Sequence, residues 1–171
     1  MTGAVVVPVF LSPKECADAI ALFPPVAAAG VIDSKVSRKG RASFLPGEAS
    51  DWLHGRLVEL LVRVNERHFR FELGGSEPPQ LAEYGPGDGY DHHLDLGPGP
   101  AALRKLSASV QLSAPEDYDG GELELWNTAP VERAQGAAVV FPSYLVHRVA
   151  PVTRGLRRSL VIWATGRTSF R

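Results

Sequence analysis

Apolar positions change their spacing along the chain, and the change predicts helices first and strands afterwards. From about residue 50 to residue 67, apolar side chains recur every three or four positions, which is typical of an amphipathic helix with one buried face. The recurring residues are Leu53, Leu57, Leu60, Leu61 and Val64. An earlier helix is predicted to begin at Ser12–Glu15, where serine, proline and glutamate are placed to form a capping box, and to end before Pro24.

Beyond residue 68, short apolar runs of strand length follow one another, and glycine- or proline-bearing turns separate most of them. Residues 26–47 predict only weak strands and loops. The predicted strands are Val5–Phe10, which we expect to be buried, and then Phe69–Leu73, Gln80–Tyr84, Asp91–Asp95, Leu106–Ser113, Glu122–Trp126, Ala137–Phe141, His147–Val149 and Leu156–Ala164. This order predicts an α+β fold that is mainly β, a sandwich or jelly roll with two N-terminal helices packed on one sheet.

Length and composition fit one domain over residues 1–171, with a helical support segment at 1–68 and a β core at 69–165. The formal net charge is −1 without a run of like charges, which argues against a nucleic-acid partner. No stretch of 18 apolar residues predicts a membrane span, and no N-terminal signal segment is recognisable, so we expect a cytoplasmic protein. The single cysteine, Cys16, excludes an intramolecular disulfide and is predicted to be a small buried residue. The pattern does not predict an oligomeric state.

Candidate metal chemistry centres on two of the five histidines. His93 and Asp95 are two residues apart on a predicted strand and therefore share one face, while His92 points the other way. An imidazole and a carboxylate on one face supply two parts of a 2-His-1-carboxylate site for iron(II). His147 begins another predicted strand and is the candidate third ligand, although a histidine that ends a loop would fit that position equally well.

A second candidate site lies on the last predicted strand. Arg157 and Ser159 share a face there, and a guanidinium beside a hydroxyl suits a bound carboxylate. The alternative is an edge strand with surface arginines, which describes Arg154 and Arg158 more readily than Arg157.

Taken in order, four motifs resemble the iron(II)/2-oxoglutarate-dependent dioxygenases, in particular the prolyl 4-hydroxylase-like and PKHD-type hydroxylases. The motifs are Tyr84-x-x-Gly87-x-x-Tyr90-x-x-His93-x-Asp95, Asp119-Gly120-Gly121-Glu122-Leu123, Phe141-Pro142-Ser143 with His147-x-Val149, and Gly155-x-Arg157-x-Ser159. The resemblance implies a double-stranded β-helix, that is, a jelly roll. It also implies hydroxylation of an unactivated carbon, such as one in a prolyl residue or a free amino acid, with release of succinate and CO2.

The resemblance also implies site roles and cofactors. His93, Asp95 and His147 would bind iron(II), and Arg157 would pair with the C5 carboxylate of 2-oxoglutarate. The cosubstrate would also meet Ser159, Tyr84, Leu123 and Val149, and Gln111 stands where several relatives carry a tyrosine. Molecular oxygen would be the second cosubstrate, with ascorbate as a reductant.

The sequence distinguishes three candidate functions. An oxygenase would act on a small molecule, a peptide or a protein loop, and the candidate substrate contacts are Tyr90, Arg41, Trp126 and His92. A catalytically silent jelly-roll binding module should have lost a ligand or the carboxylate clamp, and this chain retains both. A zinc hydrolase with the same ligands would need a general base, and the sequence singles none out.

Overall fold

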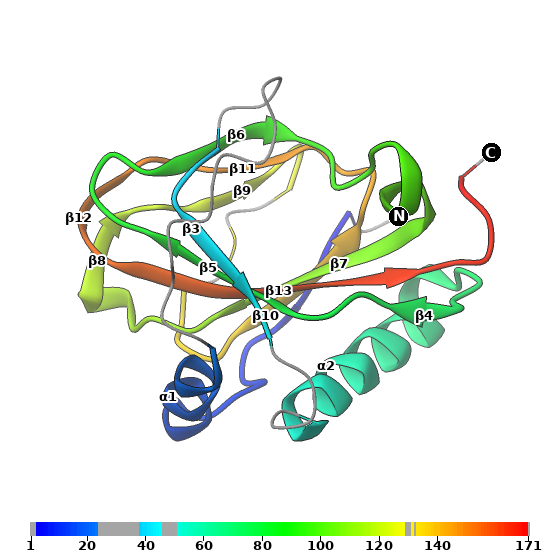
Figure 1. Ribbon diagram of the computed structural model, residues 1–171, viewed down its shortest axis with the longest axis horizontal. Coiled ribbons are helices and arrows are strands. Elements are labelled where there is room, and N and C mark those ends of the chain that lie inside the picture. The colour runs from blue at the N-terminus through cyan, green and yellow to red at the C-terminus, as the bar shows by residue number, and fades with distance from the viewer. Residues whose placement is uncertain (1–2, 24–37, 46–50, 129–130, 132, 171) are drawn as a thin grey trace.

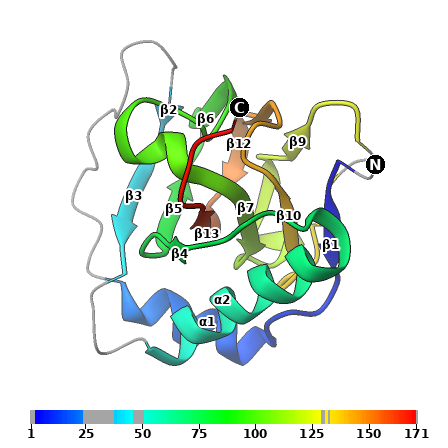
Figure 2. The same ribbon diagram turned by 90° about the vertical axis from the view of Figure 1, so that its right-hand side faces the viewer.

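Two antiparallel sheets face each other, and both long helices cover the outer face of the larger sheet (Figures 1 and 2). The computed structural model describes residues 3–23, 38–45, 51–128, 131 and 133–170. The larger sheet has the order β1 (Val5–Val7), β10 (Ala138–Pro142), β7 (Arg104–Gln111), β13 (Arg157–Thr165), β5 (Gln80–Tyr84) and β3 (Arg41–Phe44), and β4 (Gly75–Ser76) pairs with β13. The smaller sheet has the order β2 (Arg38–Lys39), β6 (Gly89–His93), β11 (His147–Val149) and β9 (Leu123–Leu125), while β12 (Val152–Gly155) pairs with β8 (Tyr118–Gly120). The predicted mainly β α+β class, with two helices on one sheet, is confirmed.

The two helices begin and pack as their sequence patterns predict. Helix α1 (Pro13–Leu22) starts with a complete capping box, in which the Ser12 hydroxyl accepts from the Glu15 backbone N–H and the Glu15 carboxylate accepts from the Ser12 backbone N–H. Helix α2 (Asp51–Val64) buries all five of the recurring apolar residues. Together with Cys16, which is fully buried, these side chains form one hydrophobic core with β7, β10 and β13. Among the described residues, no helix is long and apolar enough to cross a membrane.

Strand β13 connects this core to the space between the sheets. Its side chains alternate, so Leu160 and Ile162 are buried in the core against the helices. Arg157, Ser159 and Trp163 lie on the opposite face, where they line a cavity between the two sheets. One strand therefore stabilises the fold on one side and presents polar groups on the other.

The predicted strand Phe69–Leu73 is wrong. Helix α2 continues into a π-helical turn, η1 (Asn65–Phe69), which ends at Arg70 with a left-handed φ of 57°. The Asn65 amide then donates to the Phe71 carbonyl and accepts from its N–H, both at 2.9 Å, so it replaces the pairing that a strand would make. An apolar run of this length does not distinguish a strand from a helix end.

The predicted buried strand Val5–Phe10 is also corrected. The structure pairs only Val5–Val7, and this strand lies at the edge of the larger sheet, next to β10. Val6 is 43% exposed and Val9 is 81% exposed, so the run is only partly buried, although Phe10 at its end belongs to the core. The remaining short elements are η2 (Gly99–Leu103) and η3 (Pro115–Asp117).

Candidate metal centre and adjoining cavity

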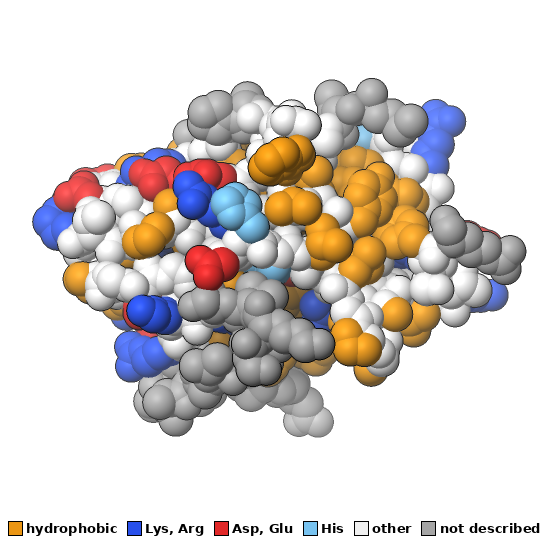
Figure 3. Space-filling view, turned by 90° about the horizontal axis from the view of Figure 1, so that it is seen from above, with side chains coloured by type: hydrophobic (Ala, Val, Ile, Leu, Met, Phe, Trp, Pro, Cys, Tyr) orange, Lys and Arg blue, Asp and Glu red, His pale blue; other side chains and the backbone are white. Residues whose placement is uncertain are grey.

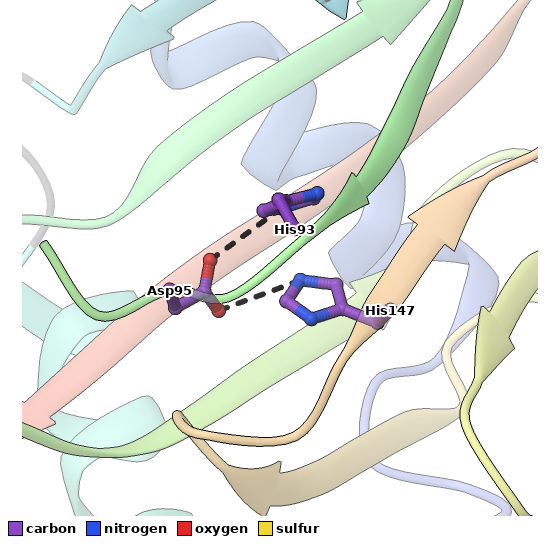
Figure 4. A group of neighbouring side chains, drawn as sticks. All are labelled: His93, Asp95 and His147. Carbon is purple, nitrogen blue, oxygen red and sulfur yellow. Dashed lines mark ion pairs between the residues drawn. The ribbon is translucent and has the colours of Figure 1, made fainter. Parts of the chain in front are cut away.

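Three buried side chains converge at one end of the smaller sheet (Figure 4). His93 ends β6, His147 begins β11, and the two residues are direct partners in the antiparallel ladder. Asp95 lies two residues beyond β6, and its carboxylate oxygens are 3.7 Å from Nε2 of His93 and 3.6 Å from Nε2 of His147. One ligand atom from each residue lies within 4.8 Å of the others. These separations are too long for hydrogen bonds and suit donors arranged around a common ion.

Backbone carbonyls determine which nitrogen of each histidine faces the carboxylate. Nδ1 of His93 lies 2.7 Å from the Asp91 carbonyl, and Nδ1 of His147 lies 2.9 Å from the Leu145 carbonyl. Because a carbonyl can only accept, each Nδ1 carries the proton and each Nε2 presents its lone pair toward Asp95. A second hydrogen bond of this kind is typical of histidines that bind metals.

The carboxylate of Asp95 is held from a different strand. The Ser107 hydroxyl, on β7, donates to Oδ2 at 2.5 Å and is itself 3.0 Å from the Ser143 hydroxyl. The Asp95 backbone N–H donates to the Ser143 carbonyl at 3.1 Å, and Arg104 donates to the Asp95 carbonyl at 3.0 Å. Ser107 was not predicted from the sequence, because only the sheet register brings it to the carboxylate.

Burial keeps the His93 ring neutral. Burial and, second to it, the nearby His147 ring together lower the pKa of His93 from 6.5 to about 4. Tyr90 stacks on the same ring, with centroids 3.6 Å apart. A neutral imidazole is the form that binds a metal, so His93 is available as a ligand at neutral pH.

The three side chains open onto a cavity of about 260 Å³. It is lined by Arg38, Phe44, Gln80, Tyr84, Tyr90, His93, Leu94, Asp95, Arg104, Ser109, Leu123, Phe141, His147, Val149, Arg157, Ser159, Val161 and Trp163. Phe44 and Leu94 are 52% and 43% exposed, so they mark the side from which solvent enters. Seen from above, hydrophobic side chains gather on the right of this face of the molecule, and charged side chains of both signs gather on the left (Figure 3).

Arg157 places a buried positive charge in the cavity wall. It is 3% exposed and donates to the Ser159 hydroxyl at 3.2 Å. In the part of the chain that the structure describes, no carboxylate forms an ion pair with it. Burial lowers the pKa of Arg157, and interactions with Tyr84 and Tyr118 counter that shift, but a guanidinium still carries its charge at neutral pH. A buried cation without a carboxylate is costly, which favours a bound anion.

One of the two glycines of the Asp119–Leu123 motif, Gly121, makes room for Arg157. Gly120 and Gly121 have left-handed φ values of 72° and 66°. A Cβ on Gly121 would lie 2.8 Å from a Val152 methyl group and 3.0 Å from Cδ of Arg157. The motif therefore allows the arginine stem to pass close to the backbone.

Gln111 contributes to this region indirectly. It does not line the main cavity but a chamber of about 20 Å³, which shares Ser109, Leu123 and Arg157 with the cavity. Its amide donates to the Tyr118 hydroxyl at 2.9 Å, and Tyr118 is 1% exposed. Tyr118 was not predicted from the sequence, although its position directly before the Asp119–Leu123 motif was a usable signal.

The other predicted contacts divide into two groups. Tyr84, Tyr90, Leu123 and Val149 line the cavity. The structure does not bring the remaining three candidates into it. Arg41 forms an ion pair with Glu83 at 2.9 Å, and His92 and Trp126 line a shallow surface hollow beside Glu124.

A family comparison agrees with this geometry. Residues 79–165, about half of the chain, match the 2OG-Fe(II) oxygenase superfamily. The chain belongs to that superfamily. The resemblance inferred from the four motifs is therefore confirmed, and the matched segment contains the candidate ligands and Arg157.

Curated relatives of this oxygenase chain include PKHD-type hydroxylases. That of Hyphomonas neptunium is 36% identical over 146 residues, which cover 79% of this chain and 63% of the relative. That of Acidovorax ebreus is 40% identical over 95 residues, which cover 50% of this chain and 42% of the relative. The chain thus spans 42% to 63% of the length of these relatives.

Solved prolyl hydroxylases share the fold over nearly the whole chain. A Pseudomonas putida prolyl-4-hydroxylase superposes with a TM-score of 0.74 at 26% identity, covering 98% of this chain and 94% of its own. A viral collagen prolyl hydroxylase from Paramecium bursaria Chlorella virus-1, solved with 2OG, has a TM-score of 0.76 at 22% identity, covering 96% of this chain and 97% of its own. The second likeness shows the fold alone, which is the predicted jelly roll.

Proposed function

We propose that the protein is an iron(II)- and 2-oxoglutarate-dependent dioxygenase that hydroxylates an unactivated carbon. One observation carries the proposal. A buried His93–Asp95–His147 cluster opens onto the same cavity as Arg157, a buried cation without a carboxylate partner among the described residues. A metal site and an anion site in one cavity are what an iron-bound 2-oxo acid requires.

The metal would be held by Nε2 of His93, Nε2 of His147 and the Asp95 carboxylate. Two neutral imidazoles and one carboxylate form the facial set that suits non-haem iron(II) and leaves positions open for other ligands. The carbonyl bonds to both Nδ1 atoms fix the ring orientation, and Ser107 fixes the carboxylate. These side chains would position the ion, and their burial would limit the access of competing water.

The distal carboxylate of 2-oxoglutarate would pair with Arg157, with the Ser159 hydroxyl beside it. Tyr84, Leu123 and Val149 would enclose the carbon chain of the cosubstrate. Gln111 would act through Tyr118: because its amide donates to the phenol oxygen, the phenol proton points away from Gln111 and is available to the anion. When bound, iron(II) and 2-oxoglutarate supply the oxygen-activating chemistry, in which the cosubstrate is converted to succinate and CO2. Ascorbate would act from solution as a reductant.

The cavity limits what the enzyme accepts. About 260 Å³ is smaller than the roughly 300–1,000 Å³ of a pocket that encloses a drug-sized ligand. Beside the cosubstrate there is room for one side chain or one small molecule, which suits a prolyl residue of a peptide or protein loop, or a free amino acid. We further propose that residues 1–171 act as one cytoplasmic oxygenase domain.

The test is an anaerobic titration of the metal-free protein with iron(II) and 2-oxoglutarate, in which the weak visible absorption of an iron(II)–2-oxo acid chelate is recorded. We expect the band only when both are present, and we expect Arg157→Gln to weaken 2-oxoglutarate binding. Arg158→Gln is the matched control, because its side chain lies on the other face of β13 and pairs with Glu83. Iron binding without the band would remove 2-oxoglutarate from the proposal. Failure to bind either would favour a silent binding module.

A further inference from the structure

A second guanidinium faces the cavity without a carboxylate partner. Arg38, on β2, lies beside the rings of Tyr90 and Tyr84, with its guanidinium carbon 5.2 Å and 5.8 Å from their centroids. Nη1 donates to the Gln80 side-chain carbonyl at 3.2 Å. Within the described ranges, no aspartate or glutamate pairs with Arg38. The aromatic rings and the amide hold this cation in place but leave its charge uncompensated.

Arg104, the other cation on this part of the wall, is already neutralised. Nε and Nη2 of Arg104 donate to the two carboxylate oxygens of Glu77 at 2.6 Å and 2.7 Å. Its guanidinium also stacks on the Trp163 ring, 4.0 Å from the centroid, and donates to the Asp95 carbonyl. Its hydrogen-bonding capacity is therefore used by the protein itself.

When iron(II) and 2-oxoglutarate are bound, the other charges of the site cancel and that of Arg38 is left unbalanced. This step rests on the proposed function. Iron(II) brings two positive charges and Arg157 one, while Asp95 and the two carboxylates of 2-oxoglutarate bring three negative charges, so the inner site is neutral. Arg38 then adds one positive charge to a cavity with aromatic and aliphatic walls, where a charge is poorly screened.

We propose that the substrate carries a carboxylate and that Arg38 binds it. A guanidinium pairs with a carboxylate through two parallel charge-assisted hydrogen bonds, which would fix the orientation of the substrate as well as add affinity. The carboxylate comes either from the α-carboxyl group of a free amino acid or from an acidic side chain of a peptide. In both cases Arg38 is a specificity-determining residue that orients the carbon presented to the metal.

The experiment measures succinate formation with two sets of probes. The first set is the free L-amino acids, each compared with its own α-amide. The second set is end-blocked peptides in matched pairs that differ only by aspartate against asparagine or glutamate against glutamine. We expect one member of either set to stimulate turnover about tenfold more in its acid form than in its amide form. Stimulation confined to the first set identifies a free amino acid, and stimulation confined to the second identifies an acidic peptide.

Three variants assign the effect to Arg38. Arg38→Gln should lower kcat/KM for the stimulating acid about tenfold or more and leave its amide unaffected, while Arg38→Lys should restore part of the loss. Lys39→Gln is the matched control, because it removes the same charge from the next residue, which is exposed and does not line the cavity. Under anaerobic conditions the stimulating acid should also perturb the visible band of the iron(II)–2-oxoglutarate protein, and Arg38→Gln should abolish that perturbation.

The outcomes separate this inference from the proposed function. An absent band in the unsubstituted protein refutes the proposed function itself. A normal band, with acids and amides equally effective, or with neither set stimulating turnover, overturns the role of Arg38 alone. Equal losses in Arg38→Gln and Lys39→Gln also overturn it, because the effect would then be general electrostatics. An unchanged band in Arg38→Gln shows that this variant is folded and loaded.

Discussion

The Asp95 carboxylate is oriented by one hydroxyl, so Ser107→Ala should weaken metal binding without unfolding the protein. Ser107 donates to Oδ2 at 2.5 Å, and Asp95 lies beyond the end of β6, where no ladder holds it. Without the hydroxyl, the carboxylate is free to rotate and has to be reordered each time that a metal binds. The Ser143 hydroxyl lies 3.0 Å from that of Ser107 and bonds to it rather than to the carboxylate, so it would lose a partner itself.

The size of the effect follows from the type of bond. A hydrogen bond to a charged group contributes about 1.5–3 kcal/mol, which corresponds to roughly a 10- to 150-fold loss of iron(II) affinity. Loss of an outer partner of a metal ligand typically costs about 10- to 100-fold, in the same range. Ser107 is fully buried in β7, and alanine removes one oxygen atom without adding bulk, so we expect the free energy of unfolding to fall by about 1–3 kcal/mol, which leaves the protein folded.

The assay is calorimetric titration of the metal-free protein with iron(II) under anaerobic conditions, together with thermal unfolding. Ser113→Ala is the matched control, because Ser113 is also buried and its hydroxyl makes two hydrogen bonds, to the Leu156 carbonyl and from the Arg158 N–H. Iron(II) affinity that is unchanged in Ser107→Ala, or reduced equally in both variants, would refute the reasoning.

Three further predictions concern other parts of the molecule. Gly121→Ala forces a Cβ to within 3.0 Å of Cδ of Arg157 at a left-handed φ, so calorimetry should show about a tenfold loss of 2-oxoglutarate affinity; unchanged affinity would contradict the steric argument. Burial raises the pKa of Cys16 to about 11 and thus stabilises the thiol form, so the free energy of unfolding should fall as pH rises from 9 toward 11. Thiol reagents at pH 8 should react rapidly with Cys16 only after denaturation, and rapid reaction of the native protein would contradict this. Leu57→Ala, at a fully buried position of α2, should lower the free energy of unfolding by about 2–5 kcal/mol in denaturant titrations, against about 0.5 kcal/mol or less for Val62→Ala on the exposed face; equal losses would place the core elsewhere.

Local patterns were sufficient to predict the two helices and to place His93 and Asp95 in one candidate site. The three-to-four spacing in α2 depends only on helix geometry, and the capping box of α1 involves four consecutive residues. The position of His147 needed more than periodicity, because a strand of three residues shows almost no alternation. Its assignment came from the order of the motifs, and the ladder then places it directly opposite His93.

Contacts that depend on register were not accessible from the sequence. Ser107 lies on the larger sheet, whereas Asp95 follows a strand of the smaller one. Tyr118 lines the same small chamber as Arg157, and the chain turns just after it at the left-handed glycines Gly120 and Gly121. Arg38 lies beside Tyr90 only because β2 pairs with β6. Trp126 was a candidate because of its side-chain type. Near the end of a short strand, however, side-chain type does not determine whether a residue faces the cavity or the solvent.

Asp95 shows how a correct sequence inference can hold for a different physical reason. Strand alternation predicted that it shares a face with His93, yet β6 ends at His93 and the ladder does not extend to Asp95. Its place is determined instead by two backbone bonds from other elements, one to the Ser143 carbonyl and one from Arg104. Arg104 also pairs with Glu77 and stacks on Trp163 of the cavity wall, so one side chain contacts both Asp95 and that wall. Substitutions in the cavity wall should therefore alter metal affinity as well as substrate selection. A metal ligand held within a regular strand would keep its position when the wall is changed.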